Sequence, residues 1–482
     1  MSAIALSAPL AGRRSPAVGV AALAGSVVAS AWLAVGAAGG DYLVQLPTSV
    51  HPAWIHGPLS HLGGSLGPAG VSVALAVSTG CYLVALACAS AIPLRRALAG
   101  VVLANLAFTL GPTLVSTDVF GYVAYAREAA HGLNPYVSAP AAMPHDAILP
   151  FVYWKHQTSP YGPLFTVASL PLGLASPVVA LWLYKAAAGA ASIGLAWLAA
   201  VAAPNPTRAA LLVGLNPVLL VYAVSGAHND LLGALLVAAA LVLVVRRRDS
   251  AGATAAVGAL AIKATFGLAL PFVVIGARRR RTAVRAAALA LVALGVPALL
   301  LFGPHLLDQV HRIASGRLFD IAFSGPDRLA TLLGTRIDSA IRLACMGAAG
   351  AVALAMVVRA WRGGDWITAA GWAFLALIAS IASLAPWYLV WLLPFAALSR
   401  SRSLRAATLL ATVYLIAVHV PALGGQPWLS PSHADALRGP RARVGDERRA
   451  APTATATTRD LLRPGTAENQ RRTAPRGSPS SS

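Results

Sequence analysis

The chain has 482 residues, of which 57% are hydrophobic and only 11% charged, and its mean hydropathy is +0.69. Water-soluble globular proteins carry about 25% charged residues, so the composition excludes that class and predicts an integral membrane protein. The apolar stretches are continuous Ala, Leu and Val runs rather than the short alternations of an outer-membrane barrel. The expected fold is therefore all-α, with helices as the membrane spans.

The formal net charge is +21, but only three of the 37 basic residues are lysines: Lys155, Lys185 and Lys263. The arginines stand in short clusters between apolar runs and in the C-terminal tail, without a folded basic domain, so no nucleic-acid partner is expected. Positive-inside topology signals explain most of them. All three cysteines lie within apolar runs, which supports neither a disulfide framework nor a Cys metal site.

The positions of the arginine clusters predict a multi-pass topology, because a span needs about 20 apolar residues and clustered arginines stay in the cytoplasm. The first run follows Arg13 and Arg14 and resembles a secretory signal, but its length favours a retained helix over a cleaved one. With a cytoplasmic start, the chain makes about 13 crossings. The expected spans are 15–36, 70–92, 97–115, 178–203, 208–224, 230–245, two within 250–277, 282–303, 339–358, 366–385, 387–399 and 406–424.

This topology leaves two large loops outside the membrane, 116–160 and 304–338. The short apolar piece 163–175 contains Pro171 and is interpreted as re-entrant or interfacial, because a crossing there would reverse all later clusters. Residues 1–424 form the expected transmembrane domain. The tail, 425–482, is rich in Arg, Pro, Thr and Ser, lacks apolar periodicity and is expected to be disordered.

Lys263 interrupts the apolar stretch 250–277, which lies between two arginine clusters that should both be cytoplasmic. An even number of crossings is then required, so we expect two helices of about 13 residues meeting at Lys263. Each would be about 20 Å long, shorter than a bilayer of about 30 Å. A buried ammonium needs an anion: a lipid phosphate at the outer leaflet, or a structural pairing with Asp118 or Asp230.

Most of the remaining polar and aromatic clusters fall on the external face, and an ionisable group at membrane depth indicates a functional site by default. Asp118 begins a stretch, 118–131, that can form an interfacial helix with Tyr122 and Tyr125 beside the carboxylate. Either Asp118 or Thr117 merely caps this helix, or Asp118 is a general base that accepts a proton from a sugar hydroxyl.

The segment His228-Asn229-Asp230 allows the same two interpretations, because Asn229 or Asp230 can open the following helix as a cap. His228 has no second His or carboxylate at metal-ligand spacing, and the chain contains no D-x-D motif. No metal ion is therefore expected. Trp387, Tyr388 and Trp391 are either an interfacial aromatic belt or a platform for a sugar ring.

Seven short motifs follow one another along residues 97–424. The first of them comes directly after an early predicted span. They are D-V-F-G-Y, G-L-N-P-Y, S-P-Y-G-P-L, N-P-V-L-L, S-G-A-H-N-D-L-L, K-A-T and P-W-Y-L-V-W-L-L-P. This arrangement resembles the GT-C superfamily of membrane glycosyltransferases. It is most similar to the actinobacterial polyprenol-phosphate-mannose-dependent alpha-1,6-mannosyltransferases of the MptB type.

The resemblance implies an enzyme in the cytoplasmic membrane, without a cofactor, that extends a lipoglycan mannan on the extracytoplasmic side from polyprenyl-phosphate mannose. Asp118 matches the base, and the anomeric centre is inverted in one displacement. Lys263, with Arg127 and His228 as further candidates, would bind the donor phosphate. The substrate-binding candidates are Tyr122, Asn134, Tyr136, Tyr161, Asn229, Asp230, Trp387 and Tyr388.

Two alternatives stay open at this stage. A transporter or flippase for a polyprenyl-linked sugar would use the same cation and aromatic groups, although the sequence shows no inverted repeat and gathers its polar groups on one side. A GT-C enzyme with another polyprenyl-phosphate sugar, glucose or arabinofuranose, would bind the same anionic lipid. Acceptor length, linkage and oligomeric state are not encoded in these motifs.

Overall fold

The protein is described by a computed structural model over residues 15–39, 46–308 and 321–421. Every regular element in these ranges is a helix, which confirms the all-α prediction. The predictions about Arg13, Arg14 and the tail 425–482 fall outside the described residues.

The helix boundaries follow local sequence signals. Several of the long helices begin with proline in the first turn, where its missing N–H is tolerated. Side-chain caps also mark helix starts, in some cases together with a proline: Ser176, Asn205 and Asp365 each accept a backbone N–H of the first turn. The α-helices are α1 Pro16–Ala38, α2 Pro68–Ala87, α3 Leu94–Leu110, α4 Asp118–Ala130, α5 Pro163–Gly173, α6 Pro177–Ala202, α7 Pro206–Gly214, α8 Asp230–Val245, α9 Asp249–Ile262, α10 Ala269–Gly276, α11 Arg280–Phe302, α13 Gly325–Leu332, α14 Ser339–Trp361, α15 Trp366–Ser380, α16 Leu393–Leu398 and α17 Arg402–Ala417.

Shorter helical segments join them. Leu219–Val224 (η6) is a π-helix, and the remainder are 3-10 helices. The 3-10 segments are η1 Ala53–Ile55, η2 Pro58–Leu62, η3 Ala89–Ala91, η4 Pro140–Ala142, η5 Leu149–Phe151, η7 Ala264–Leu268, η8 Pro304–Leu307 and η9 Pro386–Trp391.

Five helices in the described ranges are long and apolar enough to cross a membrane: α1, α2, α6, α11 and α14. Six shorter apolar helical segments accompany them. In α11 and α14 only 17% and 11% of the most apolar window is buried, so these two helices present most of their apolar side chains outward. A hydrophobic surface of this extent matches a lipid environment rather than water, and the chain is a membrane protein.

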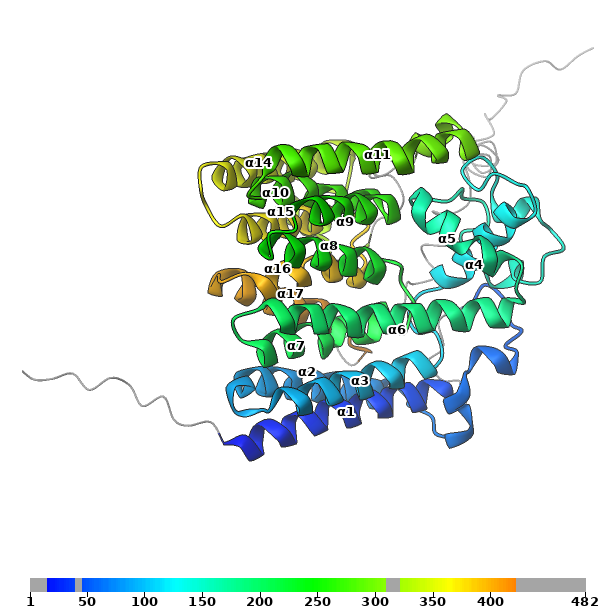
Figure 1. Ribbon diagram of the computed structural model, residues 1–482. Helices are drawn as coiled ribbons and strands as arrows, with labels where there is room; N and C mark the ends of the chain where they lie inside the picture. The colour runs from blue at the N-terminus through cyan, green and yellow to red at the C-terminus, as the bar shows by residue number, and fades with distance from the viewer. Residues whose placement is uncertain (1–14, 40–45, 309–320, 422–482) are drawn as a thin grey trace, which may run out of the picture. The chain divides into compact units, whose positions relative to one another are not determined.

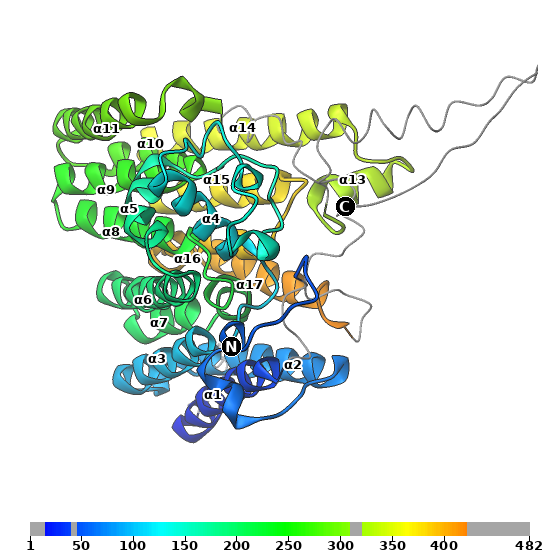
Figure 2. The ribbon, with the colours of Figure 1, turned by 90° about the vertical axis from the view of Figure 1, so that its right-hand side faces the viewer.

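The helices stack in successive layers within the described part of the chain (Figures 1 and 2). Helices α1, α2 and α3 pack together, and α3 contacts both α6 and α7. Next come α8 and α16, followed by α9, α10 and α15, and finally α11 and α14. Segments far apart in sequence therefore lie side by side, as α16 does with α7 and α8.

Two of the apolar segments are broken where the sequence places polar residues. Lys263 adopts an extended conformation between α9 and η7, which confirms the predicted pair of short helices meeting at this lysine. Between α7 and η6, the Asn216 side-chain oxygen accepts the N–H groups of Val218 and Leu219. At each break the helix is interrupted, and a polar side chain points into the protein.

Helices α4 and α5 lie at one end of the stacked helices (Figure 1) and pack against each other. Helix α4, Asp118–Ala130, covers all but the last residue of the stretch 118–131 for which a helix was expected. Arg127 of α4 pairs with Asp146 at 2.7 Å and also donates to the carbonyl oxygens of Gly173 and Ala175. These contacts attach the loop after α4, and the end of α5, to α4 itself.

Candidate functional site

The segments before Asp118 and His228 both contain a residue with left-handed backbone geometry. Val115 has φ of 70° and Ala227 has φ of 54°, and for residues other than glycine such a conformation costs about 1–3 kcal/mol. A π-helix, η6, also precedes His228, and π-helical turns are frequent at functional sites. The fold therefore holds strained backbone beside both segments that carry the polar motifs.

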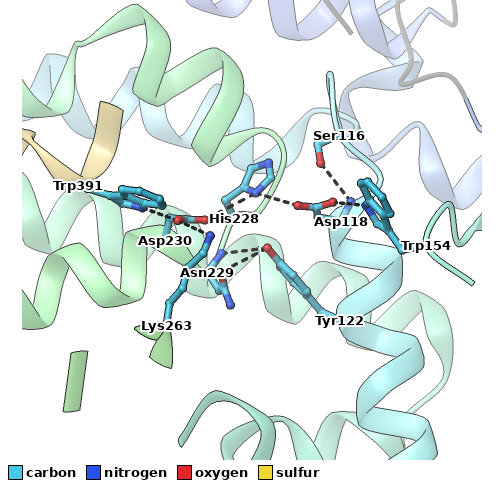
Figure 3. Close-up of polar contacts among 9 residues, drawn as sticks. All are labelled: Ser116, Asp118, Tyr122, Trp154, His228, Asn229, Asp230, Lys263 and Trp391. Atoms are coloured by element: carbon cyan, nitrogen blue, oxygen red, sulfur yellow. Dashed lines mark hydrogen bonds and ion pairs between the residues drawn. The ribbon is translucent and has the colours of Figure 1, made fainter. Parts of the chain in front are cut away.

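Asp118 starts α4, but its carboxylate does not cap the helix. Neither Asp118 nor Thr117 makes a side-chain cap hydrogen bond. Instead, Asp118 Oδ1 accepts the indole N–H of Trp154 at 3.1 Å, and Oδ2 lies 3.6 Å from Nδ1 of His228 (Figure 3). Because 16% of its side chain is exposed, the carboxylate is accessible to a bound ligand.

The surroundings of Asp118 shift its acidity. Burial raises the pKa of the carboxyl to about 6, against the smaller lowering effects of the Trp154 hydrogen bond and of Lys263. Asp230 adds a further small increase. A carboxylate with a pKa near 6 is mostly ionised at neutral pH and still holds a proton well, which suits a general base.

Asp230 and Lys263 form an ion pair of 2.8 Å between α8 and the break after α9. Asp230 is 1% exposed and its Oδ1 also accepts the indole N–H of Trp391, so its predicted alternative as a cap does not apply. The Lys263 ammonium lies 5.0 Å from the ring of Tyr388 and 5.3 Å from that of Trp391, which adds cation–π stabilisation. Lys263 is 14% exposed, and Asp230 occupies only one of its three N–H groups.

His228 lies between the Asp118 and Asp230 carboxylates on their buried side. The ring is fully buried and stacks on Trp387 with centroids 3.9 Å apart. Its Nδ1 lies 3.6 Å from Asp118 Oδ2 and 4.0 Å from Asp230 Oδ2. The prediction of a direct phosphate contact by His228 is wrong, because the buried ring has no accessible surface. Trp387, at 4% exposed, is likewise neither an interfacial belt residue nor a free platform.

A second layer of aromatic and amide side chains supports the cluster. The hydroxyl of Tyr122 donates to the Asn229 side-chain oxygen and accepts the Asn229 backbone N–H, both at 3.4 Å. Tyr161 packs edge-on against Tyr122 at 4.9 Å. Tyr122, Asn229 and Tyr161 are 7% exposed or less, so they hold the turn before α8 beside α4 and do not present a surface to a ligand.

Lys185 ties the two polar segments together, although its position in an apolar run gave no indication of this. The side chain is fully buried, and its ammonium donates to three carbonyl oxygens, those of Phe108, Pro112 and Ser225, at 3.1, 3.3 and 2.8 Å. Phe108 and Pro112 precede Asp118, while Ser225 precedes His228. One cation therefore fixes the spacing between the segments that carry the candidate base and the histidine.

Three predicted site residues lie elsewhere. The guanidinium of Arg127 is occupied by Asp146, so Arg127 does not reach the cluster. The Asn134 amide donates to the Phe302 carbonyl, and the hydroxyl of Tyr136 bonds Thr166. Residue type and an external location suggested these roles, but their side chains point into the packing of the loop against α5 and α11.

Two indoles complete the cluster: Trp154, which the sequence analysis did not single out, and Trp391, for which it expected an interfacial belt or a sugar platform. Trp154 and Trp391 donate their N–H groups to Asp118 and Asp230. Trp391 stands in the aromatic motif, whereas Trp154 lies in the loop between α4 and α5, 36 residues beyond Asp118. In the described ranges, no group of three His, Cys, Asp or Glu side chains is arranged to hold a metal ion.

Gly162 allows the S-P-Y-G-P-L segment to pack closely against the backbone directly before Lys263. Its N–H donates to the Ile262 carbonyl at 2.8 Å, and an added Cβ would lie 2.2 Å from the Ala261 carbonyl oxygen. We expect Gly162→Ala to push α9 away and lower stability by about 1–3 kcal/mol, with a loss of activity as Lys263 moves. Thermal unfolding of the purified protein measures this. Gly80→Ala is the control, because its Cβ would meet nothing within 4 Å; equal melting temperatures for both variants would contradict the packing argument.

The fold and the site together define the class: a helical membrane protein in which an accessible carboxylate and an accessible ammonium lie on either side of a buried histidine. The sequence profile described as alpha-(1→6)-mannopyranosyltransferase, N-terminal domain, of the MptA/MptB family, matches residues 18–279, and that of the MptB C-terminal domain matches 330–433. The chain therefore belongs to the MptA/MptB family of alpha-(1→6)-mannopyranosyltransferases.

Curated relatives agree with this assignment. The chain is 32% identical over 200 residues to alpha-(1→6)-mannopyranosyltransferase A of Mycobacterium tuberculosis, covering 37% of this chain and 38% of the relative. The protein of the same name from Corynebacterium glutamicum is 31% identical over 172 residues, 33% of this chain and 34% of the relative. The matched segment thus spans little more than a third of each relative. No solved structure matches the chain.

Proposed function

We propose that this chain transfers mannose from polyprenyl-phosphate mannose to an alpha-1,6-mannan acceptor of a lipoglycan. The observation that carries the proposal is the cluster in Figure 3, where Asp118 and Lys263 keep accessible surface while His228 and Asp230 between them are buried. Family membership supports mannosyl transfer. A base for the acceptor hydroxyl and a cation for the donor phosphate are the two groups that such a transfer needs.

The chemistry follows from the two accessible groups. The acceptor oxygen attacks the anomeric carbon of the donor, the bond from that carbon to the phosphate oxygen breaks, and Asp118 takes the hydroxyl proton. The configuration inverts in this single displacement, so no covalent intermediate forms. The phosphate leaves without protonation, and Lys263 stabilises the charge that develops on it.

The proposed location is the cytoplasmic membrane, with the site on the extracytoplasmic side and about 13 crossings over residues 1–424. In this arrangement α4 is an interfacial helix of the first external loop, and residues 425–482 form a separate tail. The apolar helices and the arginine clusters support it. Cysteine labelling from one side of the membrane, at exposed positions 155 and 247, tests the prediction that these lie on opposite faces.

A panel of donors tests the activity itself. Purified protein in detergent or nanodiscs is incubated with a mannoside acceptor and radiolabelled polyprenyl phosphates that carry mannose, glucose or arabinofuranose. We expect product with the mannose donor and an alpha-1,6 linkage by glycosidase digestion. Product from another donor alone would assign a different sugar, and absence of product with every donor would contradict the proposal.

The acidity of Asp118 predicts a pH profile for this reaction. Since the base acts in its ionised form, kcat/KM should rise with pH, reach half its maximum near the pKa of about 6 and level off above it. In Trp154→Phe the hydrogen bond that stabilises the carboxylate is lost, so the pKa of Asp118 rises and the midpoint moves to higher pH. Initial rates between pH 5 and 9 measure both; an unchanged midpoint in the variant would show that Asp118 is not the titrating group.

A further inference from the structure

The aromatic rings that contact the charged groups and the histidine of the cluster differ in exposure. Trp387 and Trp391 are buried, whereas Trp154 and Tyr388 are partly exposed. Partly exposed aromatic rings beside polar groups commonly line ligand sites, because their faces bind apolar groups while their polar edges make hydrogen bonds. Trp154 and Tyr388 are therefore the rings of this cluster that a substrate can touch.

These two rings lie beside different reacting groups. The indole N–H of Trp154 donates to Asp118 at 3.1 Å, whereas Tyr388 lies 5.0 Å from the ammonium of Lys263. The buried side chain of His228 lies between the base and the cation (Figure 3). Trp154 therefore belongs to the side of the base, and Tyr388 to the side of the cation.

Inversion at the anomeric carbon assigns one substrate to each side. In a single displacement the attacking oxygen and the leaving oxygen lie on opposite faces of that carbon. A phosphate beside Lys263 and an acceptor hydroxyl beside Asp118 satisfy this requirement, with the donor sugar between them. The attacking oxygen and the Trp154 N–H bond the same carboxylate, so they lie within about 8 Å of each other. The sugar that carries this oxygen is then next to the indole.

The position of the indole is fixed by contacts within the protein. The Trp154 carbonyl accepts the Gln157 N–H at 2.9 Å, and the Gln157 carbonyl accepts the hydroxyl of Tyr125 from α4, also at 2.9 Å. Tyr153 packs edge-on against the indole, with ring centroids 5.5 Å apart. A side chain that is already held in position loses little conformational entropy when a ligand binds. The indole is therefore a preformed binding surface.

We propose that Trp154 forms the acceptor subsite: its indole stacks on the terminal mannose of the acceptor and places the attacking hydroxyl on the Asp118 carboxylate. The inference rests on the function proposed above and adds the group that recognises the acceptor. The negative face of the indole attracts the C–H groups of the sugar, while its N–H keeps the carboxylate in position. One side chain thus binds the acceptor and orients the base.

A comparison of Trp154→Leu with Trp154→Phe isolates the aromatic ring. Both variants lose the N–H bond to Asp118, so rates are measured on the high-pH plateau, where the carboxylate is ionised in each. We expect KM for a mannoside acceptor to rise about 10- to 100-fold in Trp154→Leu but to stay within about threefold of wild type in Trp154→Phe. KM for the donor should be unchanged in both. Trp361→Leu is the control, because Trp361 is 61% exposed and its ring lies against Arg280 of α11.

Two kinetic outcomes would overturn the assignment: the same acceptor KM in the Leu and Phe variants, or a rise in the donor KM instead of the acceptor KM. If Trp154→Leu does not fold, hydroxyl-radical footprinting of the wild-type protein takes its place. A mannoside acceptor should protect Trp154 from oxidation and leave the oxidation of Trp361 unchanged. Equal oxidation of Trp154 with and without the mannoside would contradict the proposal.

Footprinting requires no turnover, so it separates this inference from the proposed function. A wild-type protein that forms no product with any donor counts against the proposed function, and protection of Trp154 by the mannoside would still support the acceptor subsite. Active wild type in which the mannoside does not protect Trp154 counts only against the subsite.

Discussion

Asp118→Asn should abolish mannosyl transfer while the protein stays folded. The amide cannot accept the hydroxyl proton, and loss of a general base reduces rates by about 10²- to 10⁴-fold. The amide oxygen of the variant side chain can still accept the Trp154 N–H, which in the wild type bonds the carboxylate at 3.1 Å, so the loop keeps its anchor. Radiolabel transfer from polyprenyl-phosphate mannose, together with thermal unfolding, measures the two effects separately.

Asp308→Asn is the matched control for this substitution. Asp308 is 60% exposed and forms an exposed ion pair with His305, and such pairs contribute little to stability. The control should therefore transfer mannose at the wild-type rate. Asp118→Asn with a wild-type rate and a wild-type melting temperature would rule out Asp118 as the base.

Lys263→Met should remove both activity and stability, and a second substitution should restore only the stability. The single variant leaves the Asp230 carboxylate buried without its counter-ion, and breaking a buried pair in this way costs about 3–5 kcal/mol. In Lys263→Met with Asp230→Asn the uncompensated charge is gone, so most of that loss should be recovered. Transfer should remain about 10²- to 10³-fold below wild type in both, because the cation that stabilises the leaving phosphate is absent.

Melting temperatures and transfer rates of the single and double variants decide between two roles for this lysine. Recovery of transfer in the double variant would mean that Lys263 serves only to neutralise Asp230, and the phosphate role would be falsified. Lys155→Met is the control, since Lys155 is an exposed lysine of the loop between α4 and α5 and its loss should change neither quantity.

Several elements of the site were predictable because their signals are local. Lys263 in the middle of an apolar run predicted a helix break, and the structure has an extended residue there between α9 and η7. The helix after Asp118 followed from a single stretch of 13 residues. In both cases the determining interactions lie within one or two helical turns, so composition and spacing along the chain are sufficient.

The wrong assignments share a different cause. Arg127 at the end of α4, and Asn134 and Tyr136 in the loop after it, have the chemistry of binding residues. Their side chains instead bond Asp146, the Phe302 carbonyl and Thr166. A motif gives the residue type without the direction of the side chain. Direction depends on which neighbour packs against the loop, and those neighbours lie up to 168 residues away.

The sequence alone determined that this is a helical membrane protein, where its apolar segment breaks at Lys263, and which carboxylate and lysine are the candidates for its chemistry. These properties depend on hydrophobicity and on interactions between near neighbours in the chain. Only the tertiary structure paired Lys263 with Asp230, stacked His228 on Trp387 and brought the Trp154 indole to Asp118. Such contacts join segments far apart in the chain, and they form only when the packing of the helices selects one arrangement from the many that the same hydrophobic pattern allows.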